Sequence, residues 1–309
     1  MTLTAPTLPA LSTDLPPVER RAAIPGGFAA AGGVAGIKAS GRPDLALVAT
    51  LPGPGGGRAR AAAAAVFTPN AFAAAPVRLS RAHLAATDPA GDGRFGWATG
   101  IISTSGCANA ATGAAGDADQ AIVAEILAAA LGTTEDETLL LSTGIIGTRL
   151  PLDIVRAGVA AVAPMLAPSD DGLAAAAEAL RTTDSVAKAA TTTLTLPDED
   201  GLAVRSVRVT GIAKGVGMIH PRMATMLSIV LTDATVDPAT LHGLLRPATA
   251  RTWDQLSVDG DTSTNDTVFL LASGAAGAPT AAAGPGRGSE VGRGGEAGGS
   301  RPPRQQSAD

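Results

Sequence analysis

The sequence predicts a layered protein of mixed α-helices and β-strands. Short apolar runs bounded by glycine and proline are typical of buried strands, and longer segments carry apolar residues at helical spacing. Aromatic residues make up only 2% of the chain, so alanine, valine, leucine and isoleucine must build the core. With 309 residues, 45% of them hydrophobic, the chain is long enough for one large domain or two ordinary ones.

The strands expected in the first half are runs of small aliphatic residues. LALVAT (45–50) and AAVFT (64–68) each read as a strand, with turn residues between them. Residues 98–116 read as a strand that enters a loop of small residues. TLLLSTGIIG (138–147) reads as a buried strand that runs into a glycine turn.

Helical periodicity marks the segments between these strands. ADQAIVAEILAAALG (118–132) places four apolar residues on one helical face, and Gly132 is the expected stop. The residues of that face are Ile122, Val123, Ile126 and Leu127. Residues 152–180 read as two further helical segments, the first with Asp153 near its start.

The second half of the chain also contains both strand-like and helix-like segments. Residues 194–213 read as a hairpin across the turn PDEDG, and LSIVLTDA (227–234) reads as a buried strand. Asp237 is expected to cap a helix that has Pro238 at its first position. We therefore divide the chain into an N-terminal arm at 1–21 and a structured region that ends near residue 277.

The composition excludes several classes of protein. The chain has a net charge of −5 and no basic stripe interleaved with aromatic residues, which argues against a nucleic-acid partner. It lacks an uninterrupted apolar run of about eighteen residues, so we expect no membrane helix. One cysteine and three scattered histidines exclude a disulfide framework and make a zinc site of the usual spacing improbable.

Both ends of the chain look unstructured. Residues 1–21 lack the basic and apolar regions of a signal peptide, so we expect a loose arm and a cytoplasmic protein. Residues 278–309 are rich in glycine, alanine, arginine and proline, with Val291 as the single large aliphatic residue. Because this tail cannot bury a core, we expect it to be disordered.

KGVGMIHPRMATML (214–227) reads as a constrained turn that feeds an apolar strand. A threonine hydroxyl is a poor nucleophile unless a base lies beside it. Cleavage between Ala224 and Thr225 would make Thr225 an N-terminal residue, whose α-amino group, with a pKa of about 7.7–8.0, could serve as that base. The alternative is that Thr225 is simply a β-branched residue at the start of a strand.

Two polar segments strengthen the catalytic interpretation. In LLLSTGIIG (139–147) a strand ends at Thr143 and Gly144, where a hydroxyl and a backbone N–H could stabilise an oxyanion. The alternative is an ordinary turn from a strand to a helix, in which glycine occurs because the turn needs backbone dihedral angles that glycine adopts easily. SVDGDTSTNDTV (257–268) is dominated by aspartate, threonine, serine and asparagine, with a solvated loop or an incomplete calcium loop as its alternatives.

A third polar segment, RTTDSVAK (181–188), gathers hydroxyl groups and charges. Such a cluster suits a functional site. It equally suits a helix N-cap at Thr183 or Asp184.

Taken together and in this order, these segments resemble the ornithine acetyltransferases, also called glutamate N-acetyltransferases, of the cyclic arginine pathway. The resemblance covers residues 22–277, and KGxGMIxPxMATML joined to DGDTSTND is highly specific. The matching segments are GIKASGRPDLALV, VFTPNAFAAAPV, SGCANAATGAAG, LLLSTGIIGTRLP, RTTDS, AKGVGMIHPRMATML and SVDGDTSTNDT.

The resemblance implies an ornithine-acetyltransferase-type fold, a two-layered α/β architecture with an N-terminal-nucleophile mechanism. It implies self-cleavage at Ala224–Thr225 into an α-chain region (22–224) and a β chain that begins with 225–277. The two chains stay together, commonly as an α2β2 heterotetramer. Thr225 then carries acetyl from N2-acetylornithine to glutamate, releasing ornithine and forming N-acetylglutamate.

The resemblance also assigns roles to other residues. Thr143 and Gly144 match the oxyanion-stabilising pair, and Lys214 matches a lysine that lies near the nucleophile and contacts substrate. Thr182 matches a substrate-binding threonine, with Thr183 as the alternative assignment. No cofactor is implied; some members also accept acetyl-CoA as a donor, and the sequence leaves that point open.

The chain departs from the family pattern toward its C-terminus. Members of the family have a DGEG-type motif and an asparagine and a threonine at the C-terminus, and this sequence contains neither feature. We interpret this difference as a truncated or frame-shifted C-terminus. The family's Asn-Ser-Gly-Asn loop is replaced by Thr104-Ser105-Gly106-Cys107 (104–107). On these grounds we expect poor folding and little turnover. Two alternative functions stay open: a non-catalytic remnant of this family, or another N-terminal-nucleophile amidohydrolase or aminopeptidase.

Overall fold

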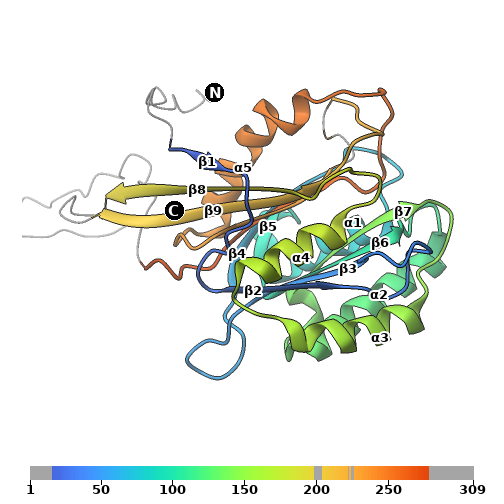
Figure 1. The fold of residues 1–309 in the computed structure, drawn as a ribbon, viewed down its shortest axis with the longest axis horizontal. Coiled ribbons are helices and arrows are strands. Elements are labelled where there is room, and N and C mark those ends of the chain that lie inside the picture. Colours follow the sequence, from blue (N-terminus) through green and yellow to red (C-terminus); the bar gives the residue numbers. More distant parts are fainter. Residues whose placement is uncertain (1–15, 198–203, 222, 224–225, 278–309) are drawn as a thin grey trace, which may run out of the picture.

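Two β-sheets and the helices around them build the protein. The computed structural model describes residues 16–197, 204–221, 223 and 226–277. The layers follow one another in the order helix, larger sheet, helices, smaller sheet, helices (Figure 1). The mixed α/β class expected from the sequence is confirmed, with two sheets as its β layers.

The larger sheet has seven strands in the described part of the chain. In spatial order they are β1 (Val18–Glu19), β8 (Lys188–Pro197), β9 (Val204–Lys214), β10 (Leu227–Thr232), β11 (Thr267–Ala272), β4 (Ala61–Phe67) and β5 (Phe95–Ala98). Strands β10 and β11 run parallel to each other, and every other pairing in this sheet is antiparallel.

The smaller sheet has four strands. In spatial order they are β2 (Phe28–Gly33), β3 (Leu45–Thr50), β6 (Gly100–Cys107) and β7 (Thr138–Ile145). Strands β6 and β7 are parallel, and the helix between them in the chain supplies the crossover that a parallel pair requires.

Five α-helices cover these sheets within the described residues. They are α1 (Ala75–Thr87), α2 (Gly113–Leu131), α3 (Leu152–Val162), α4 (Asp170–Leu180) and α5 (Pro238–Arg251). Short 3-10 helices lie at Pro89–Gly91, Glu135–Glu137, Ala163–Met165 and Trp253–Gln255. Helices α1 and α4 pack between the sheets, α2 and α3 cover the smaller sheet, and α5 covers the larger one (Figure 1).

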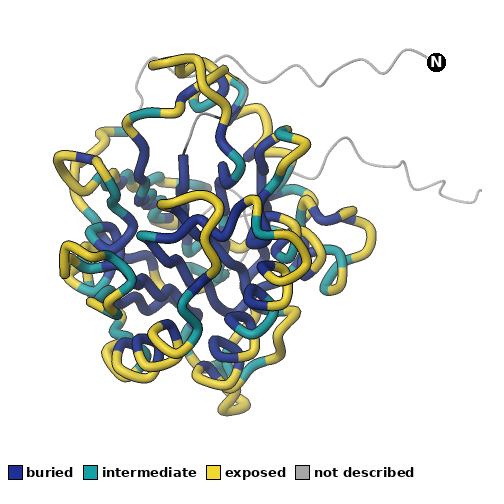
Figure 2. Tube along the Cα trace, turned by 90° about the vertical axis from the view of Figure 1, so that its right-hand side faces the viewer, coloured by how far each residue is buried: buried dark blue, intermediate teal, exposed yellow. Residues whose placement is uncertain are grey.

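Strand β4 shows why the apolar runs are continuous rather than alternating. Ala61, Ala63 and Ala65 belong to the core between the two sheets, while Ala62 and Ala64 pack in the core beneath α5. Both faces of the strand are covered, so every position is buried. Figure 2 shows the buried segments gathered in the interior of the molecule and the exposed segments around its outside. Alanine at alternate positions on the outer face lets α5 approach the strand closely.

Most of the expected elements are confirmed. Helix α2 ends at Gly132, which has a left-handed backbone with φ 67°, and its buried face includes Val123, Ile126 and Leu127. The hairpin is confirmed by the pairing of β8 with β9, although its turn at 198–203 lies outside the described residues. Asp237 caps α5, since its side chain accepts a hydrogen bond from Thr240 N at 3.0 Å.

The helix N-cap considered for RTTDSVAK is wrong. No helix begins at Thr183 or Asp184 in the structure; the chain turns there and enters β8. The side chain of Asp184 instead accepts hydrogen bonds from groups distant in the chain, described below with the site.

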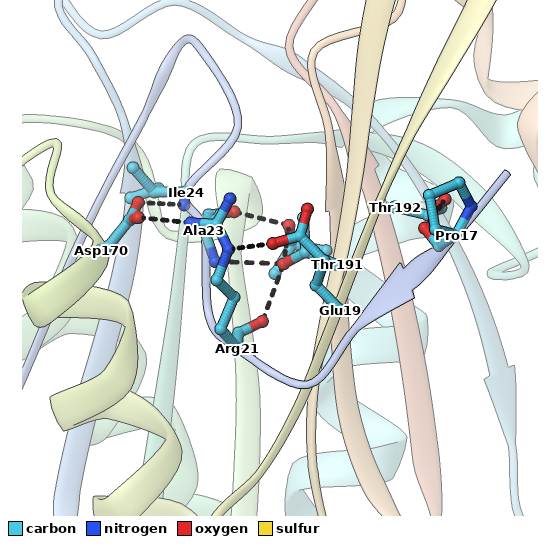
Figure 3. A network of polar contacts seen from close by, with 9 residues as sticks. Pro17, Glu19, Arg21, Ala23, Ile24, Asp170, Thr191 and Thr192 are labelled. Carbon is cyan, nitrogen blue, oxygen red and sulfur yellow. Dashed lines mark hydrogen bonds and ion pairs between the residues drawn. The ribbon is translucent and has the colours of Figure 1, made fainter.

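Residues 16–21, the described end of the expected N-terminal arm, cross from the larger sheet to α4 (Figure 3). Thr191 Oγ1 donates to the carbonyl of Arg21 at 2.8 Å and accepts from Ala23 N at 3.1 Å. Asp170, in the first turn of α4, accepts from Ile24 N at 2.8 Å and from Arg21 Nη1 at 3.1 Å. This network joins the outer strands of the larger sheet to the helix layer between the sheets.

The tail at 278–309 and residues 1–15 lie outside the described residues. None of the helices in the described part of the chain has the length and apolar character needed to span a bilayer.

Candidate active site

A hollow of about 340 Å³ opens where the ends of β7 and β9 approach each other. Four of the residues that sequence analysis selected line it: Thr143, Gly144, Thr182 and Lys214. Thr183, the alternative to Thr182, lines it as well. The other lining residues are Ala108, Ile146, Val216, Gly217, Met218, Ser263, Thr264 and Asn265.

Lys214 is the last residue of β9, and its side chain is buried with 4% of its surface exposed. Its Nζ donates a hydrogen bond to Thr143 Oγ1 at 3.1 Å. Burial lowers the pKa of Lys214, although the carboxylates of Asp184 and Asp266 act in the opposite direction. The lysine therefore joins the larger sheet to the smaller one at the wall of the hollow, and its amino group is held out of water.

Thr143 and Gly144 occupy the end of β7, beside β6. Gly144 has φ 132°, a backbone conformation that side chains with a Cβ rarely adopt. A Cβ at Gly144 would lie 2.3 Å from the carbonyl carbon of Gly106, so the close approach of the two strands requires glycine. The strand pairing becomes irregular at Cys107, directly after this contact. The backbone beside Thr143 is thus held in an unusual shape at the mouth of the hollow.

Ala224 and Thr225 lie outside the described residues, so the predicted cleavage bond and nucleophile stay predictions. The structure describes their neighbours. Met226 follows Thr225 in the chain; its N–H donates to Asp266 Oδ1 at 3.1 Å and its carbonyl accepts from Thr267 N at 3.0 Å. Leu227 pairs with Lys214 across β10 and β9. The chain therefore enters β10 beside the lysine of the site.

The turn expected before Thr225 is held by Asp259. The carboxylate of Asp259 accepts from Met218 N at 2.6 Å and from Ile219 N at 2.8 Å. These two N–H groups hold the pKa of Asp259 below its ordinary value. The backbone of Met218 is left-handed, with φ 60°, which is uncommon for a residue with a Cβ and confirms that the turn is constrained.

The segment 257–268 has two parts with different roles. Residues 257–262 are exposed, as a solvated loop would be, but they also fix the turn through Asp259. Asn265 is buried, and its Nδ2 donates to the carbonyls of Ala108 and Ser142 at 2.8 Å each. No group of metal-binding side chains occurs among the described residues, so nothing there supports a calcium loop.

Two buried carboxylates at the site were not selected from the sequence. Asp184 Oδ1 accepts from Lys188 Nζ at 2.6 Å and from Gly215 N at 2.8 Å. Burial opposes ionisation, yet the hydrogen bonds from Lys188 and Gly215 and the charge of Lys214 hold the pKa of Asp184 below its ordinary value. Asp266, the other carboxylate, is 1% exposed. An aspartate inside a run of hydroxyl residues was the available signal for both.

A second hollow, of about 440 Å³, lies elsewhere and contains none of the predicted site residues. It is bordered by arginines, among them Arg81, Arg94 and Arg246, and by His242. The convergence of Thr143, Lys214 and Thr182 makes the smaller hollow the better candidate for chemistry.

Comparisons with known proteins identify the family of the chain. The ArgJ family model matches residues 29–290. An arginine biosynthesis bifunctional protein ArgJ from Synechococcus is 46% identical over 255 residues, which cover 82% of this chain and 56% of the relative. The mitochondrial ArgJ protein of Penicillium rubens is 42% identical over 258 residues, covering 83% of this chain and 50% of the relative. The chain thus spans about half the length of the curated relatives it matches.

Solved structures of an ornithine acetyltransferase and an ArgJ protein are also similar to this chain. An ornithine acetyltransferase from Mycobacterium tuberculosis, complexed with ornithine, is 37% identical with a TM-score of 0.54, covering 69% of this chain and 100% of that one. The arginine biosynthesis bifunctional protein from Bacillus halodurans is 28% identical with the same TM-score and the same coverage. On the family match and these relatives, the chain belongs to the ArgJ family.

Proposed function

We propose that this chain carries the acyl-transfer site of a glutamate N-acetyltransferase of arginine biosynthesis. In the proposed reaction acetyl moves from N2-acetylornithine to Thr225 and then to glutamate. The single observation that carries the proposal is the hydrogen bond from Lys214 Nζ to Thr143 Oγ1 in a hollow that Gly144 and Thr182 also line. The printed names of the relatives, among them an acetyltransferase with bound ornithine, support this substrate class.

The proposed sequence of events begins with cleavage of the Ala224–Thr225 bond. The freed amino group of Thr225 then accepts the proton of its own hydroxyl, and the oxygen attacks the acetyl carbon of N2-acetylornithine. Ornithine leaves, and the amino group of glutamate attacks the resulting ester. Each attack places negative charge on the acetyl oxygen, so both half-reactions need the same oxyanion-stabilising groups.

Thr143 and Gly144 are proposed to supply those groups. Because Lys214 donates to Thr143 Oγ1, the threonine oxygen acts as the acceptor in that bond and its own O–H is left to donate elsewhere. The N–H at Gly144 would be the second donor. Thr182, on the wall of the hollow, is proposed to bind the amino-acid portion of the substrate, together with the charge of Lys214.

Other aspects of the assembled enzyme are also part of the proposal. We expect no cofactor, an α2β2 assembly of the two chains, and the cytoplasm as location. The sequence leaves open whether acetyl-CoA serves as a second acetyl donor. Fungal relatives, among them that of Penicillium rubens, have "mitochondrial" in their names, and the Synechococcus relative does not. The supply of acetyl from acetyl-CoA is tested by replacing N2-acetylornithine with it in the assay below.

The test begins with intact mass and denaturing electrophoresis of the freshly expressed chain, beside a Thr225→Ala variant. Two fragments that join at Ala224–Thr225, absent in the variant, are the expected result. The cleaved protein is then incubated with N2-acetylornithine and glutamate. Formation of N-acetylglutamate supports the transferase, whereas free acetate would identify a hydrolase, and an uncut chain without turnover would identify a non-catalytic remnant.

A further inference from the structure

The amino group that serves as base during acetyl transfer exists only after the Ala224–Thr225 bond has been cut. Before that, the nitrogen of Thr225 belongs to a peptide bond and cannot accept a proton. The cut itself therefore needs another group, one that removes the proton of the attacking hydroxyl and delivers a proton to the leaving nitrogen. Within the described part of the chain, three buried ionisable side chains interact electrostatically on the segments that flank this bond: Lys214, Asp184 and Asp266.

The contacts of these three groups separate them. Lys214 Nζ donates to Thr143 Oγ1, and Asp184 Oδ1 is shared by Lys188 and by Gly215 N–H, on the strand before the turn. Asp266 is the carboxylate that contacts the residue next in the chain after this bond. Its Oδ1 accepts from the N–H of Met226, the residue that directly follows Thr225.

The position of Asp266 is fixed from both sides. Thr267, next in the chain, donates its N–H to the carbonyl of Met226 at 3.0 Å, and β11 then runs parallel to β10 in register. Asn265, on the other side, is anchored to the carbonyls of Ala108 and Ser142. Asp266 is 1% exposed, and its Oδ2 has no hydrogen-bond partner among the described residues. A buried carboxylate oxygen without a partner is costly. Asp184 Oδ2 shares this property, so the contact with Met226 is what distinguishes Asp266.

We propose that Asp266 is the acid–base residue of self-cleavage. Its Oδ2 takes the proton of the Thr225 hydroxyl as that oxygen attacks the carbonyl carbon of Ala224. As the C–N bond breaks, the proton passes to the nitrogen of Thr225, which becomes an amine, and Ala224 is held as an ester on Thr225. Water hydrolyses the ester, leaving a carboxylate on Ala224 and restoring the hydroxyl of Thr225. This inference rests on the proposed function and extends it.

The charges around Asp266 suit this exchange. Burial raises the pKa of Asp266 to about 7, against the opposing effects of the Ser263 hydroxyl, the Met226 N–H and the charge of Lys214. Lys214, on β9, is in turn influenced by Asp184 and Lys188. A carboxyl group that titrates near neutral pH can both take and return a proton at similar cost, as general acid–base catalysis requires.

The experiment compares the wild-type chain with Asp266→Asn and, as a control, Asp261→Asn, which changes an exposed aspartate in the same segment. Each 309-residue chain is made by cell-free synthesis, and the uncut fraction is followed by intact mass between pH 5.5 and 8.5. Asparagine retains an oxygen that can accept from Met226 N–H, so the fold is expected to persist, and circular dichroism checks it. We expect Asp266→Asn to slow cleavage by about 100-fold or more, while Asp261→Asn cleaves like wild type.

The pH profile distinguishes proton transfer from a structural role. The wild-type rate is expected to rise through about pH 7 as Asp266 ionises, and this rise is expected to vanish in Asp266→Asn. If folded Asp266→Asn is cut at the wild-type rate, the inference is overturned while the proposed function stands. If Asp266→Asn does not fold, the wild-type profile decides, because a rate independent of pH overturns the inference. A wild-type chain that stays uncut like Thr225→Ala overturns the proposed function as well.

Discussion

Lys214 Nζ and Thr143 Oγ1 lie 3.1 Å apart, although one residue ends a strand of the larger sheet and the other lies near the end of a strand in the smaller sheet. The contact closes the site across the layer boundary. It also keeps a lysine almost entirely out of water, with 4% of its surface exposed. Such a lysine is expected to cost stability and to be retained for its chemistry.

Replacement of Lys214 by methionine should therefore separate stability from function. We expect Lys214→Met to raise the melting temperature at pH 7, because methionine fills similar space without a buried charge. Self-cleavage or acetyl transfer should fall by about 100-fold, the usual size of the loss when an electrostatic contact is removed from an active site. Thermal unfolding and the cleavage assay measure the two effects, and a lower melting temperature would contradict the argument.

The same lysine should give stability a pH dependence. Its pKa is lowered in the folded protein relative to the ordinary 10.5, so the unfolded chain binds the proton more tightly. The free energy of unfolding contributed by Lys214 should thus rise with pH up to about 10.5, and this rise should disappear in Lys214→Met. Denaturant titrations of both proteins between pH 7 and 10.5 provide the comparison.

Thr143 should contribute to cleavage and acetyl transfer through its hydroxyl group rather than through the shape of its side chain. Thr143→Val retains the branched side chain but removes both the acceptor for Lys214 and the O–H donor, so we expect cleavage or transfer to fall by about 100-fold or more. Thr143→Ser retains the hydroxyl and serves as the matched control. Equal rates for valine and serine would remove Thr143 from the oxyanion site.

Gly144 should tolerate no side chain. In Gly144→Ala the new Cβ would meet the backbone of Gly106 at 2.3 Å, and we expect the strand end to shift and the reaction to be lost. Gly147→Ala is the control, since Gly147 also has a positive φ, of 85°, but a Cβ there meets nothing within 4 Å. Rates and melting temperatures of both variants distinguish a local clash from general backbone strain.

The network in Figure 3 allows a test of stability away from the site. Thr191 Oγ1 bonds buried backbone groups of Arg21 and Ala23, so Thr191→Val should lower the free energy of unfolding by about 1–3 kcal/mol. Thr192→Val is the control. It removes an exposed bond to the carbonyl of Pro17 and should cost about 0.5 kcal/mol or less. Similar losses in a denaturant titration would show that burial is not the cause.

The elements were predictable where one pattern decides the structure. Strand β4 could be recognised because it is apolar on both faces, and α2 could be ended at Gly132 because a left-handed residue there favours glycine. The alternative of an N-cap at Thr183 or Asp184 is wrong for an equally physical reason, which the contacts of Asp184 show. Its carboxylate bonds Gly215 N–H, a partner brought near by the fold rather than by the local chain.

In the candidate site, too, some residues could be predicted from local sequence and others could not. Thr143, Gly144, Thr182 and Lys214 were found from motifs, and the structure places them around one hollow. Asp266 was not selected, since its significance depends on a parallel pairing of β10 with β11, which no local pattern reveals. Ala224 and Thr225 lie outside the described residues and rest on the sequence.

The position of β10 and β11 inside the larger sheet bears on whether the chain folds before or after it is cleaved. β10 is bonded on one side to β9, and β11 is bonded on the other to β4, both from the part that precedes the predicted cut. A cut made before folding would leave each fragment with open sheet edges and a risk of aggregation. Cleavage should accordingly be a late step, and separating the two products should require unfolding of the whole sheet.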